Sequence, residues 1–434
     1  MSKNYVDAGS VVQNVLDGKG LKAELTRFNN QNVTLLATET LKYIFVLDSL
    51  FKNSGFLKKV KLVRSKILVS VVMVYDLCLG QGKITGGGKI KKLIYSHQNS
   101  LKTSLSRIKI SCGAVNNEDL IPKEIKNYNQ MKIYGKVHKQ NLLYSRLKSD
   151  ELKFDDFIPD LLILDRNAIA RNKSLKLLIE EGAIVVQDKS SCFPVFALKK
   201  LGFGEGDIID ACAAPGNKSL QLSNSFKKSR IFSFEINSNR FKTLKKRLSI
   251  QNTKNVFARN VDFLNVEHTQ YSTAKAILID PSCSGSGTIF RNIDQWVQRK
   301  LKTENELRQE MNKYSKLQYK LVCHAMKFPN VDLIIYSTCS VKEEENEKVV
   351  KKILQNHEHF GLVKILPKWK RRAFKNYFNW EMMVRVDHIE DETGGFFVAG
   401  FVRKKSGNNL DCSKNCIFAD EKKIFYKKLR LFDK

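Results

Sequence analysis

From Gly182 onward, short apolar runs alternate along the chain with longer helical stretches. The expected strands are 207–209, 231–234, 276–279 and 332–336. The expected helices between them include 239–251 and 304–328. Each apolar run is followed by polar or turn residues, which is typical of central strands in a parallel sheet. The alternation predicts an α/β, doubly wound, Rossmann-like domain whose ligands bind at the carboxyl ends of its strands. A last strand pair is expected over 393–401.

The chain before Gly182 has a different character. The first 115 residues are predicted to be helical, because apolar residues recur at helical spacing around 35–47 and an apolar stretch covers 60–79. The last helix of this region is expected to be basic and to run from Lys89 to Lys109. Residues 116–181 are expected to be a linker or a small α/β insert. We therefore divide the chain into four segments, which are a helical, basic N-terminal domain (1–115), the linker or insert (116–181), the α/β domain (182–404) and a basic C-terminal tail (405–434).

The charge of the chain points to a polyanionic partner. The sequence has 75 Lys and Arg against 44 Asp and Glu, a formal net charge of +31. Nucleic acid is the simplest partner for such a chain, although a compositional bias towards Lys and Asn is an alternative explanation. An anionic membrane surface is a weaker rival, because no long basic amphipathic helix stands out. The best candidate for a membrane span, 67–79, is too short and contains Asp76.

The cysteines indicate a reduced, intracellular protein. There are nine of them, an odd number at irregular spacing, and the N-terminus lacks the apolar core of a secretory signal. No pair of CxxC or Cys/His clusters occurs, so we expect no metal site. Cys412 and Cys416 are interpreted as incidental, with a metal role as the less favoured alternative.

Three acidic residues at expected strand ends favour an adenosine-type cofactor. The first strand leads through Asp210 into a turn of small residues, Cys212, Ala213, Ala214, Pro215, Gly216, Asn217 and Lys218. Glu235 follows Gly216 by nineteen residues, a spacing suited to hydrogen bonds with ribose hydroxyls. Asp262 stands where the third strand should end and could bind an adenine amino group, and Arg240 lies one helical turn beyond Glu235. Each of these residues also has a plain alternative explanation. Glu235 could be a solvated carboxylate at a helix N-terminus, Arg240 an exposed charge on a helix, and Asp262 an ordinary turn residue.

Two further strand ends carry a cysteine each. One reads Asp280-Pro-Ser-Cys283-Ser-Gly-Ser-Gly, and the other reads Tyr-Ser-Thr-Cys339-Ser. A cysteine is most often a small buried hydrophobic residue, so each alone is a weak signal. Packing does not require Ser-Cys-Ser in a polar turn, and the two together indicate chemistry at the carboxyl edge of the sheet.

These motifs together resemble the nucleolar-protein/Sun family of RNA cytosine-5 methyltransferases. The resemblance covers residues 182–401 and rests on DACAAPGNKS, DPSCSGSG, YSTCS, Gln187–Ser191, Glu345–Glu347 and GGFFVAGF. The N-terminal part is similar to one subfamily, the fifth Sun-domain member, through VYDLCLGQG, the GGG stretch and Asn117–Leu120. That subfamily methylates large-subunit ribosomal RNA. One family motif, of the form Arg-x-Asn-x-Leu-Lys, has no recognisable counterpart around 131–147.

The resemblance implies a mechanism and a set of roles. Carbon 5 of cytosine becomes nucleophilic when a thiolate adds to carbon 6, which makes the catalysis covalent. By resemblance Cys339 is the attacking nucleophile, Cys283 assists proton removal and release, and Asp280 hydrogen-bonds the ring near nitrogen 3. Lys218 is a plausible electrostatic helper because a positive neighbour lowers the pKa of a thiol, and simple solvation of the loop is the alternative. The implied cofactor, S-adenosyl-L-methionine, would be held by the residues of the turn together with Glu235, Arg240, Asp262 and Asp280.

Partners and rival functions follow from the same resemblance. We expect residues 1–115 to bind RNA, the target base to leave its stack, and a monomeric enzyme without membrane or metal that works in the nucleus and nucleolus. One rival is a catalytically idle ribosome-assembly factor that binds ribosomal RNA, against which the intact pair Cys283 and Cys339 argues. Another is a small-molecule methyltransferase, against which the charge of +31 argues.

Overall fold

A computed structural model describes residues 2–56, 64–126, 132–148, 152–165, 169, 171–288 and 292–404. The chain divides into two compact units, one formed by 1–130 with 289–307 and the other by 131–288 with 308–434. No helix among the described residues is long and apolar enough to cross a membrane. The expected tail, 405–434, and Cys412 and Cys416 within it lie outside the described residues.

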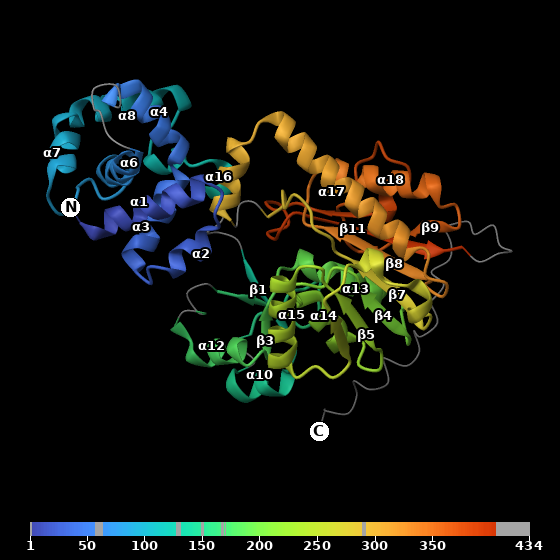
Figure 1. Ribbon diagram of the computed structural model, residues 1–434. Coiled ribbons are helices and arrows are strands. Elements are labelled where there is room, and N and C mark those ends of the chain that lie inside the picture. Colours follow the sequence, from blue (N-terminus) through green and yellow to red (C-terminus); the bar gives the residue numbers. More distant parts are fainter. Residues whose placement is uncertain are drawn as a thin grey trace. The chain divides into compact units, whose positions relative to one another are not determined.

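The first unit is helical (Figure 1). Its elements are α1 (Lys3–Leu16), α2 (Leu21–Thr26), α3 (Gln31–Lys42), α4 (Ile44–Ser54), α6 (Arg64–Cys78), α7 (Lys89–Ser96), α8 (Gln98–Cys112), η1 (Asn117–Leu120), α9 (Lys123–Lys126) and α16 (Ile293–Leu301). The basic helix expected from Lys89 to Lys109 is in fact two helices that meet at His97. Leu120 and Ile125 are buried in the core of this unit, so residues 116–126 pack with the helices before them.

Helix α16 is separated in sequence from the rest of the first unit. Its Trp296 and Val297 are buried in the same core, and the Trp296 ring packs edge-on against Phe45 at 5.3 Å. The carboxylate of Asp294 accepts a hydrogen bond from the backbone N–H of Leu21 at 3.0 Å. The sequence assigned 289–307 to the α/β domain, and the structure corrects this, because the apolar face of α16 finds its buried surface on α1 and α3.

The second unit begins with a small antiparallel sheet. Its strands are β1 (Ile133–Val137), β2 (Leu161–Leu164) and β3 (Ile184–Val186), in the order β2-β1-β3, with helices α10 (Gln140–Arg146) and α12 (Lys173–Glu180). Leu162 and Leu164 of β2 are buried with residues of these helices in a core of their own, whereas Leu161 is buried in a core shared with the larger sheet.

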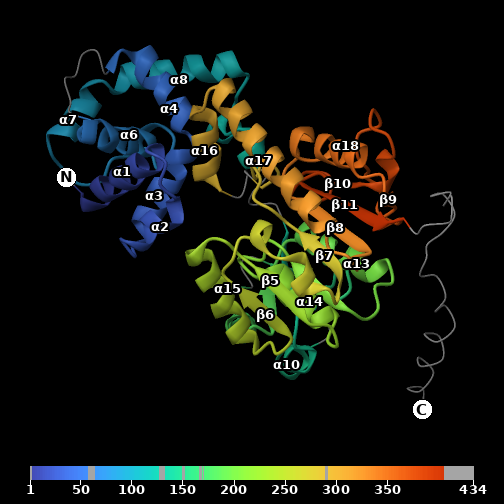
Figure 2. The same ribbon diagram turned by 45° about the vertical axis from the view of Figure 1, so that its right-hand side comes forward.

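The larger sheet has the order β10-β11-β8-β7-β4-β5-β6. Its strands are β4 (Asp207–Asp210), β5 (Ile231–Phe234), β6 (Val256–Arg259), β7 (Ala274–Ile279), β8 (Leu333–Thr338), β10 (Val384–Val386) and β11 (Phe396–Arg403), and β9 (Phe360–Val363) pairs with β11. The helices around it are α13 (Phe193–Lys200), α14 (Asn217–Ser225), α15 (Ser238–Gln251), α17 (Glu304–Ala325) and α18 (Glu347–Asn356), and short 3-10 turns are η4 (Ser190–Cys192), η5 (Phe263–Asn265), η6 (His268–Tyr271), η8 (Glu343–Glu345) and η9 (Trp380–Met382). Figure 2 shows α14 and α15 with β5 and β6, and α17 and α18 with β8 to β11.

The strand order places the ligand site. Strands β4 to β8 are parallel, and the order reverses at β4, which pairs with β5 on one side and with β7 on the other. The crevice at the carboxyl ends of the strands beside such a switch point is where doubly wound sheets bind ligands. The expected strand pair over 393–401 is wrong, because 396–403 form one continuous strand, β11, that pairs antiparallel with β8. The first six residues of β11 are all buried within this one strand, so no turn divides them into two strands.

Candidate active site

The turn after β4 brings the backbone close to a helix N-terminus. Gly216 has φ of +110°, a left-handed conformation that favours glycine, and a Cβ there would lie 2.9 Å from the Leu244 side chain. Helix α14 starts at Asn217, so its free N–H groups face the end of the sheet. Residues Cys212, Ala213, Ala214 and Pro215, which the sequence singled out, form the turn between strand and helix, and the two alanines are buried.

The second acidic position lies at the end of β5. Glu235 is 3% exposed, and its Oε1 accepts a hydrogen bond from the backbone of Asn237 at 2.8 Å. The Arg240 guanidinium lies 3.8 Å from the other carboxylate oxygen and donates to the carbonyl of Ala214 at 2.5 Å. Arg240 therefore connects the end of β5 to the turn after β4.

Asp262 occupies a different environment. Its Oδ1 accepts from the backbone N–H of Leu264 at 3.0 Å and thereby caps the turn η5. Two apolar side chains beside these acids, Ile236 and Val261, are 66% and 40% exposed. Carboxylates next to exposed apolar side chains fit a ribose and a flat base, so the residues present suit an adenosyl cofactor. The sequence analysis missed Ile236 and Val261, although each directly adjoins a residue that it named.

Asp210 is buried at the end of β4 and is incompletely satisfied. Ser219 donates a hydrogen bond of 2.6 Å to its Oδ2, whereas Oδ1 has no partner. Burial raises the pKa of this carboxyl to about 6. The site therefore holds a carboxyl that titrates near neutral pH.

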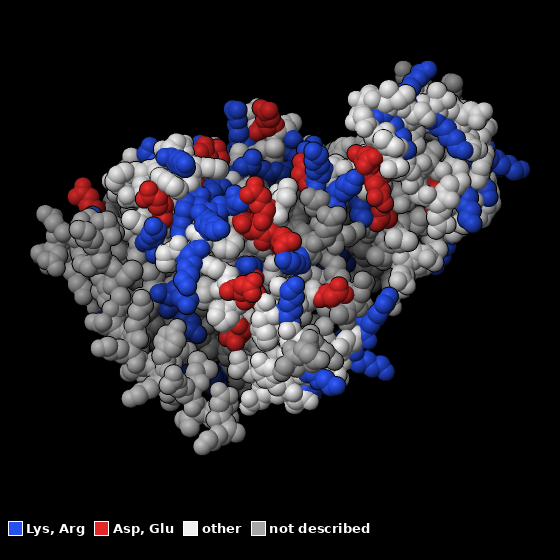
Figure 3. Space-filling view, turned by 180° about the vertical axis from the view of Figure 1, so that it is seen from behind, with Lys and Arg blue, Asp and Glu red and all other residues white. Residues whose placement is uncertain are grey.

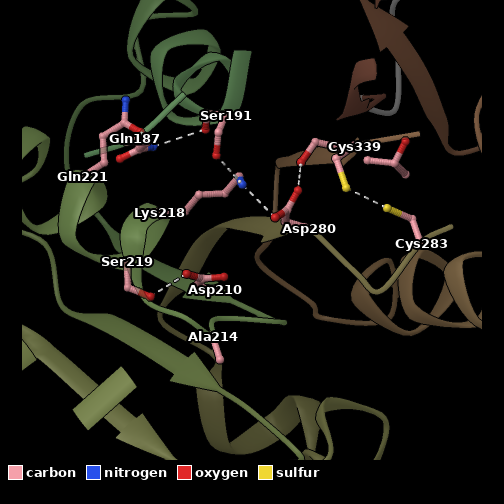
Figure 4. Close-up of polar contacts among 12 residues, drawn as sticks. Gln187, Ser191, Asp210, Ala214, Lys218, Ser219, Gln221, Asp280, Cys283 and Cys339 are labelled. Carbon is pink, nitrogen blue, oxygen red and sulfur yellow. Dashed lines mark hydrogen bonds and ion pairs between the residues drawn. The ribbon is translucent and has the colours of Figure 1, made fainter. Parts of the chain in front are cut away.

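Lys218 links the turn after β4 to Asp280 at the end of β7 (Figure 4). Its ammonium donates to Asp280 at 2.7 Å and to the Ser191 hydroxyl at 3.0 Å. The Ser337 hydroxyl of β8 donates to the other oxygen of Asp280 at 2.7 Å. Burial is the largest single effect and disfavours the charged ammonium, but the charge and hydrogen bond of Asp280, together with the charges of Asp210 and Cys339, outweigh it and raise the pKa of Lys218. Asp280 is thereby held in one orientation from two sides.

The two predicted cysteines meet. The Sγ atoms of Cys283 and Cys339 are 3.1 Å apart, and Figure 4 shows them pointing toward each other from separate loops. Both are free thiols. The hydrogen bond from Cys283 is the main influence and lowers the pKa of Cys339; burial and the charge of Asp280 oppose it, and the charge of Lys218 acts in the same direction as the hydrogen bond. The same hydrogen bond, followed by burial, raises the pKa of Cys283. The pair therefore favours a thiolate at Cys339 and a thiol at Cys283.

Comparison with known proteins identifies the family. The family model of 16S rRNA methyltransferase RsmB/F matches residues 201–402, and that of the NOL1/NOP2/Sun domain family member 5 N-terminal domain matches 33–121. The 28S rRNA (cytosine-C(5))-methyltransferase of Mus musculus is 31% identical over 92% of this chain and 90% of its own length. The chain belongs to the NOL1/NOP2/Sun domain family of RNA cytosine-C5 methyltransferases.

Other comparisons agree with this Sun-domain family assignment. The 25S rRNA (cytosine-C(5))-methyltransferase rcm1 of Schizosaccharomyces pombe is 32% identical over 91% of this chain and 90% of its own length. The crystal structure of a methyltransferase homolog protein from Pyrococcus horikoshii has the same fold, with a TM-score of 0.51 and 20% identity over 82% of this chain and 99% of that one. The prediction of a Rossmann-like methyltransferase with a helical N-terminal domain is confirmed. The match to the methyltransferase family model confirms S-adenosyl-L-methionine as its cofactor.

Several residues that line the candidate site were noted in the sequence only because they belong to stretches that match the Sun-domain family. Ser191 ends the stretch Gln187–Ser191 and contacts Lys218. Asp188 in the same stretch accepts hydrogen bonds from the Thr393 hydroxyl at 2.5 Å and the Gly394 backbone at 2.8 Å. These bonds join two stretches more than 200 residues apart, so only the fold could show that they form one wall of the site.

Proposed function

We propose that this Sun-domain methyltransferase methylates carbon 5 of a cytosine in large-subunit ribosomal RNA. The observation that carries the proposal is the contact of 3.1 Å between the Cys283 and Cys339 sulfurs beside the Lys218–Asp280 ion pair. Relatives about as long as this chain that are named 28S and 25S rRNA methyltransferases support the choice of substrate.

The cofactor supplies a methyl group when it is bound, and the protein's residues prepare the cytosine. The Cys339 thiolate forms a bond to carbon 6, and the electron pair displaced from the ring makes carbon 5 the nucleophile that takes the methyl group. Asp280, fixed by Lys218 and Ser337, hydrogen-bonds the ring near nitrogen 3 and holds it in place, while the positive charge of the nearby Lys218 ammonium offsets the negative charge that develops on the ring. Cys283 then assists removal of the proton from carbon 5, and the bond between Cys339 and carbon 6 breaks.

A trapped adduct tests these roles. We expect Cys283→Ala, incubated with large-subunit ribosomal RNA and S-adenosylmethionine, to give a slow-migrating, nuclease-sensitive band on a denaturing gel. The band should vanish in the Cys283→Ala/Cys339→Ala double variant. Cys323→Ala, at a cysteine of α17, is the control and should methylate as the wild type does.

The single variant Cys339→Ala completes the test. It should lose methyl transfer while it still binds the cofactor, measured by calorimetry with S-adenosylhomocysteine. Full activity in this variant, or an adduct in the double variant, would contradict the assignment of the nucleophile.

We further propose that the first unit holds RNA through its basic helices. The chain between Leu77 and Asn117 has seven Lys and Arg residues and no Asp or Glu. Lys83, Lys89 and Lys92 in this stretch are exposed. Figure 3 shows Lys and Arg side chains at the surface of the protein. Exposed charges of one sign bind phosphates and release counterions.

Location and assembly belong to the same proposal. We place the enzyme in the nucleolus, from its family and its charge of +31, as a monomer without a bound metal. Among the residues described, no group of three or more His, Cys, Asp and Glu side chains could hold a metal ion. Light scattering should give a mass near 49.8 kDa, and a tagged chain should concentrate in nucleoli. A mass twice this value would contradict the monomeric state, and exclusion of the tagged chain from nucleoli would contradict the proposed location.

A further inference from the structure

A buried carboxylate lies behind the cysteine pair and has no role in the mechanism proposed above. Glu345 ends the turn η8 and is 0% exposed. Its Oε1 accepts from the backbone N–H of Ser284 at 2.9 Å and from the Gln318 amide at 3.1 Å. Its Oε2 accepts from the hydroxyls of Ser284 and Ser340. One carboxylate thus receives four hydrogen bonds, which can hold an ionised acid out of water.

The two serines are the residues that directly follow the two cysteines. Ser284 carries the loop of Cys283 after β7, and Ser340 carries the loop of Cys339 after β8. Their hydroxyls are also 3.3 Å from each other. Glu345 therefore fastens both cysteine loops to a single point, although the loops are 56 residues apart in the chain.

Helix α17 fixes the same point from its other side. The Gln318 amide donates both to Glu345 and, at 3.2 Å, to the carbonyl of Ser282, the residue before Cys283. The Tyr336 hydroxyl donates to the backbone carbonyl of Glu345. The carboxylate thus has no freedom to move away from the loops, because its backbone and its side chain are both held.

We propose that Glu345 is a positioning residue for the cysteine pair, which holds the two loops at the separation where the thiols touch and favours retention of the proton by Cys283. This inference rests on the proposed function for the roles of the cysteines. It also gives a structural role to the serines that follow Cys283 and Cys339.

The charges around the pair support the second half of the proposal. The negative charge of Glu345 faces Cys283 and helps to raise the pKa of that thiol, after the larger effects of the Cys339 contact and burial. Tyr314 of α17 and Tyr336 of β8 are two further titratable groups that face Cys283. Lys218 and Asp280 face Cys339 instead. The charges of Glu345 and Lys218 favour the proton on Cys283, whereas the charge of Asp280 opposes them at Cys339.

Thiol reactivity tests this without RNA or cofactor. The full-length protein is treated with iodoacetamide across a pH series, and alkylation of each cysteine is followed by peptide mass spectrometry. We expect Cys339 to react faster than Cys283 in the wild type, and Glu345→Gln to lower the ratio of the two rates by about tenfold, the change that one unit of pKa produces. Glu344→Gln removes the same charge from the neighbouring residue, which pairs with Lys348 at the surface, and should leave the ratio unchanged.

A second variant and a second readout keep the inference open to refutation. If Glu345→Gln does not fold, Ser284→Ala removes one hydroxyl and keeps the backbone N–H bond, and should shift the ratio in the same direction by a smaller factor. For methyl transfer to ribosomal RNA by Glu345→Gln, we expect kcat to fall by a larger factor than that by which KM rises. A ratio in Glu345→Gln equal to that in Glu344→Gln would refute the positioning role. A shifted ratio in an enzyme whose wild type methylates no RNA would instead refute the proposed function alone.

Discussion

At the scale of single residues, the site depends on Lys218, which contacts three parts of the chain at once. Its ammonium bonds Asp280 and Ser191 and lies 5.4 Å from the centre of the Phe396 ring. Its charge orients Asp280 and favours the thiolate of Cys339. The sequence predicted that Lys218 would help electrostatically, but its partner Ser191 could not be chosen from the sequence, since nothing local marks which of the many serines lies beside Lys218.

Lys218→Met should therefore shift the alkylation of Cys339 to higher pH. Loss of the positive charge raises the pKa of the thiol, so less thiolate is present at neutral pH. Methyl transfer should fall by roughly ten- to a hundredfold, since a hydrogen bond to a charged group contributes about 1.5–3 kcal/mol. Stopped alkylation time courses measure the first effect. Lys228→Met, at an exposed lysine paired with Glu205, is the control, and an equal shift there would contradict the explanation.

Asp210 predicts a stability that depends on pH. Its folded pKa of about 6 exceeds the ordinary value of 3.8, so the folded state binds the proton more tightly than the unfolded state does. The resulting stabilisation is complete below about pH 4 and is lost as pH rises through about 6. Asp210→Asn should remove this dependence and stabilise the protein at pH 8 by at most about 3 kcal/mol, because two pKa units correspond to that energy.

Urea unfolding at a series of pH values measures the effect of Asp210→Asn. The buried amide of Asp210→Asn will lack some hydrogen-bond partners, which reduces the stabilisation at pH 8. The measured gain in the free energy of unfolding is therefore expected to be smaller than about 3 kcal/mol but still positive. The exposed Glu267→Gln is the control. Curves for Asp210→Asn and the wild type that stay parallel from acid to alkaline pH would refute the buried-acid explanation.

At the scale of elements, backbone contacts set the distance between the cysteine loops. The Gly287 N–H donates to the carbonyl of Cys339 at 2.9 Å, and the Gly395 N–H donates to the carbonyl of Gly287 at 2.8 Å. The loop after β7 is thus clamped between the loop after β8 and the residue before β11. A Cβ on Gly287 would lie 2.1 Å from the Gly395 carbonyl oxygen, so no side chain fits there.

Gly287→Ala should separate the two loops. Forcing backbone apart in a packed site costs about 1–3 kcal/mol, and a displacement of about 1 Å can lower a rate by about a hundredfold. Gly204→Ala is the control, because nothing lies within 4 Å of a Cβ there. Methyl transfer and thermal unfolding of both variants give the comparison, and a fully active Gly287→Ala would show that the clamp does not set the cysteine distance.

The stretch Glu345-Asn346-Glu347 shows how one short segment serves several elements. Glu345 holds the cysteine loops, the Asn346 amide donates to the carbonyl of Ser340 at 2.9 Å, and Glu347 pairs with Arg385 of β10 through two bonds of 2.5 and 2.6 Å. All three acidic or amide side chains are fully buried. The sequence showed only that this stretch matches a family. It did not predict that the stretch is buried, because three polar residues at the start of a helix are normally exposed to solvent.

At the scale of the whole molecule, the helical unit is closed by a helix from the middle of the chain. Trp296 of α16 is 3% exposed within the core of the first unit. Deleting residues 1–115 would uncover this side chain, so loss of RNA binding in such a truncation would not report on charge alone. Substitution of exposed lysines is the cleaner test of the RNA-binding role.

The triple variant Lys83→Gln/Lys89→Gln/Lys92→Gln should bind ribosomal RNA with a weaker dependence on salt. Each phosphate contact contributes about 0.7–0.9 to the slope of log affinity against log salt, so the slope should fall by about two to three. Filter binding over a range of salt concentrations measures it.

The control for this triple variant changes Lys199, Lys200 and Lys228 to Gln, three exposed lysines of the second unit. It removes the same net charge from a different unit. An equal fall in slope for both triple variants would show that net charge, rather than the basic helices, holds the RNA.

The sequence by itself determined the parallel strands, the turn from Asp210 to Lys218 and the two cysteine loops at the carboxyl edge. It could do so because hydrophobic periodicity and turn residues act over a few neighbouring positions. The tertiary structure alone decided that α16 joins the first unit, that 396–403 form one strand, and that Glu345 binds the serines after both cysteines. Those outcomes depend on which buried surfaces meet across tens to hundreds of residues, and packing of the whole chain selects them.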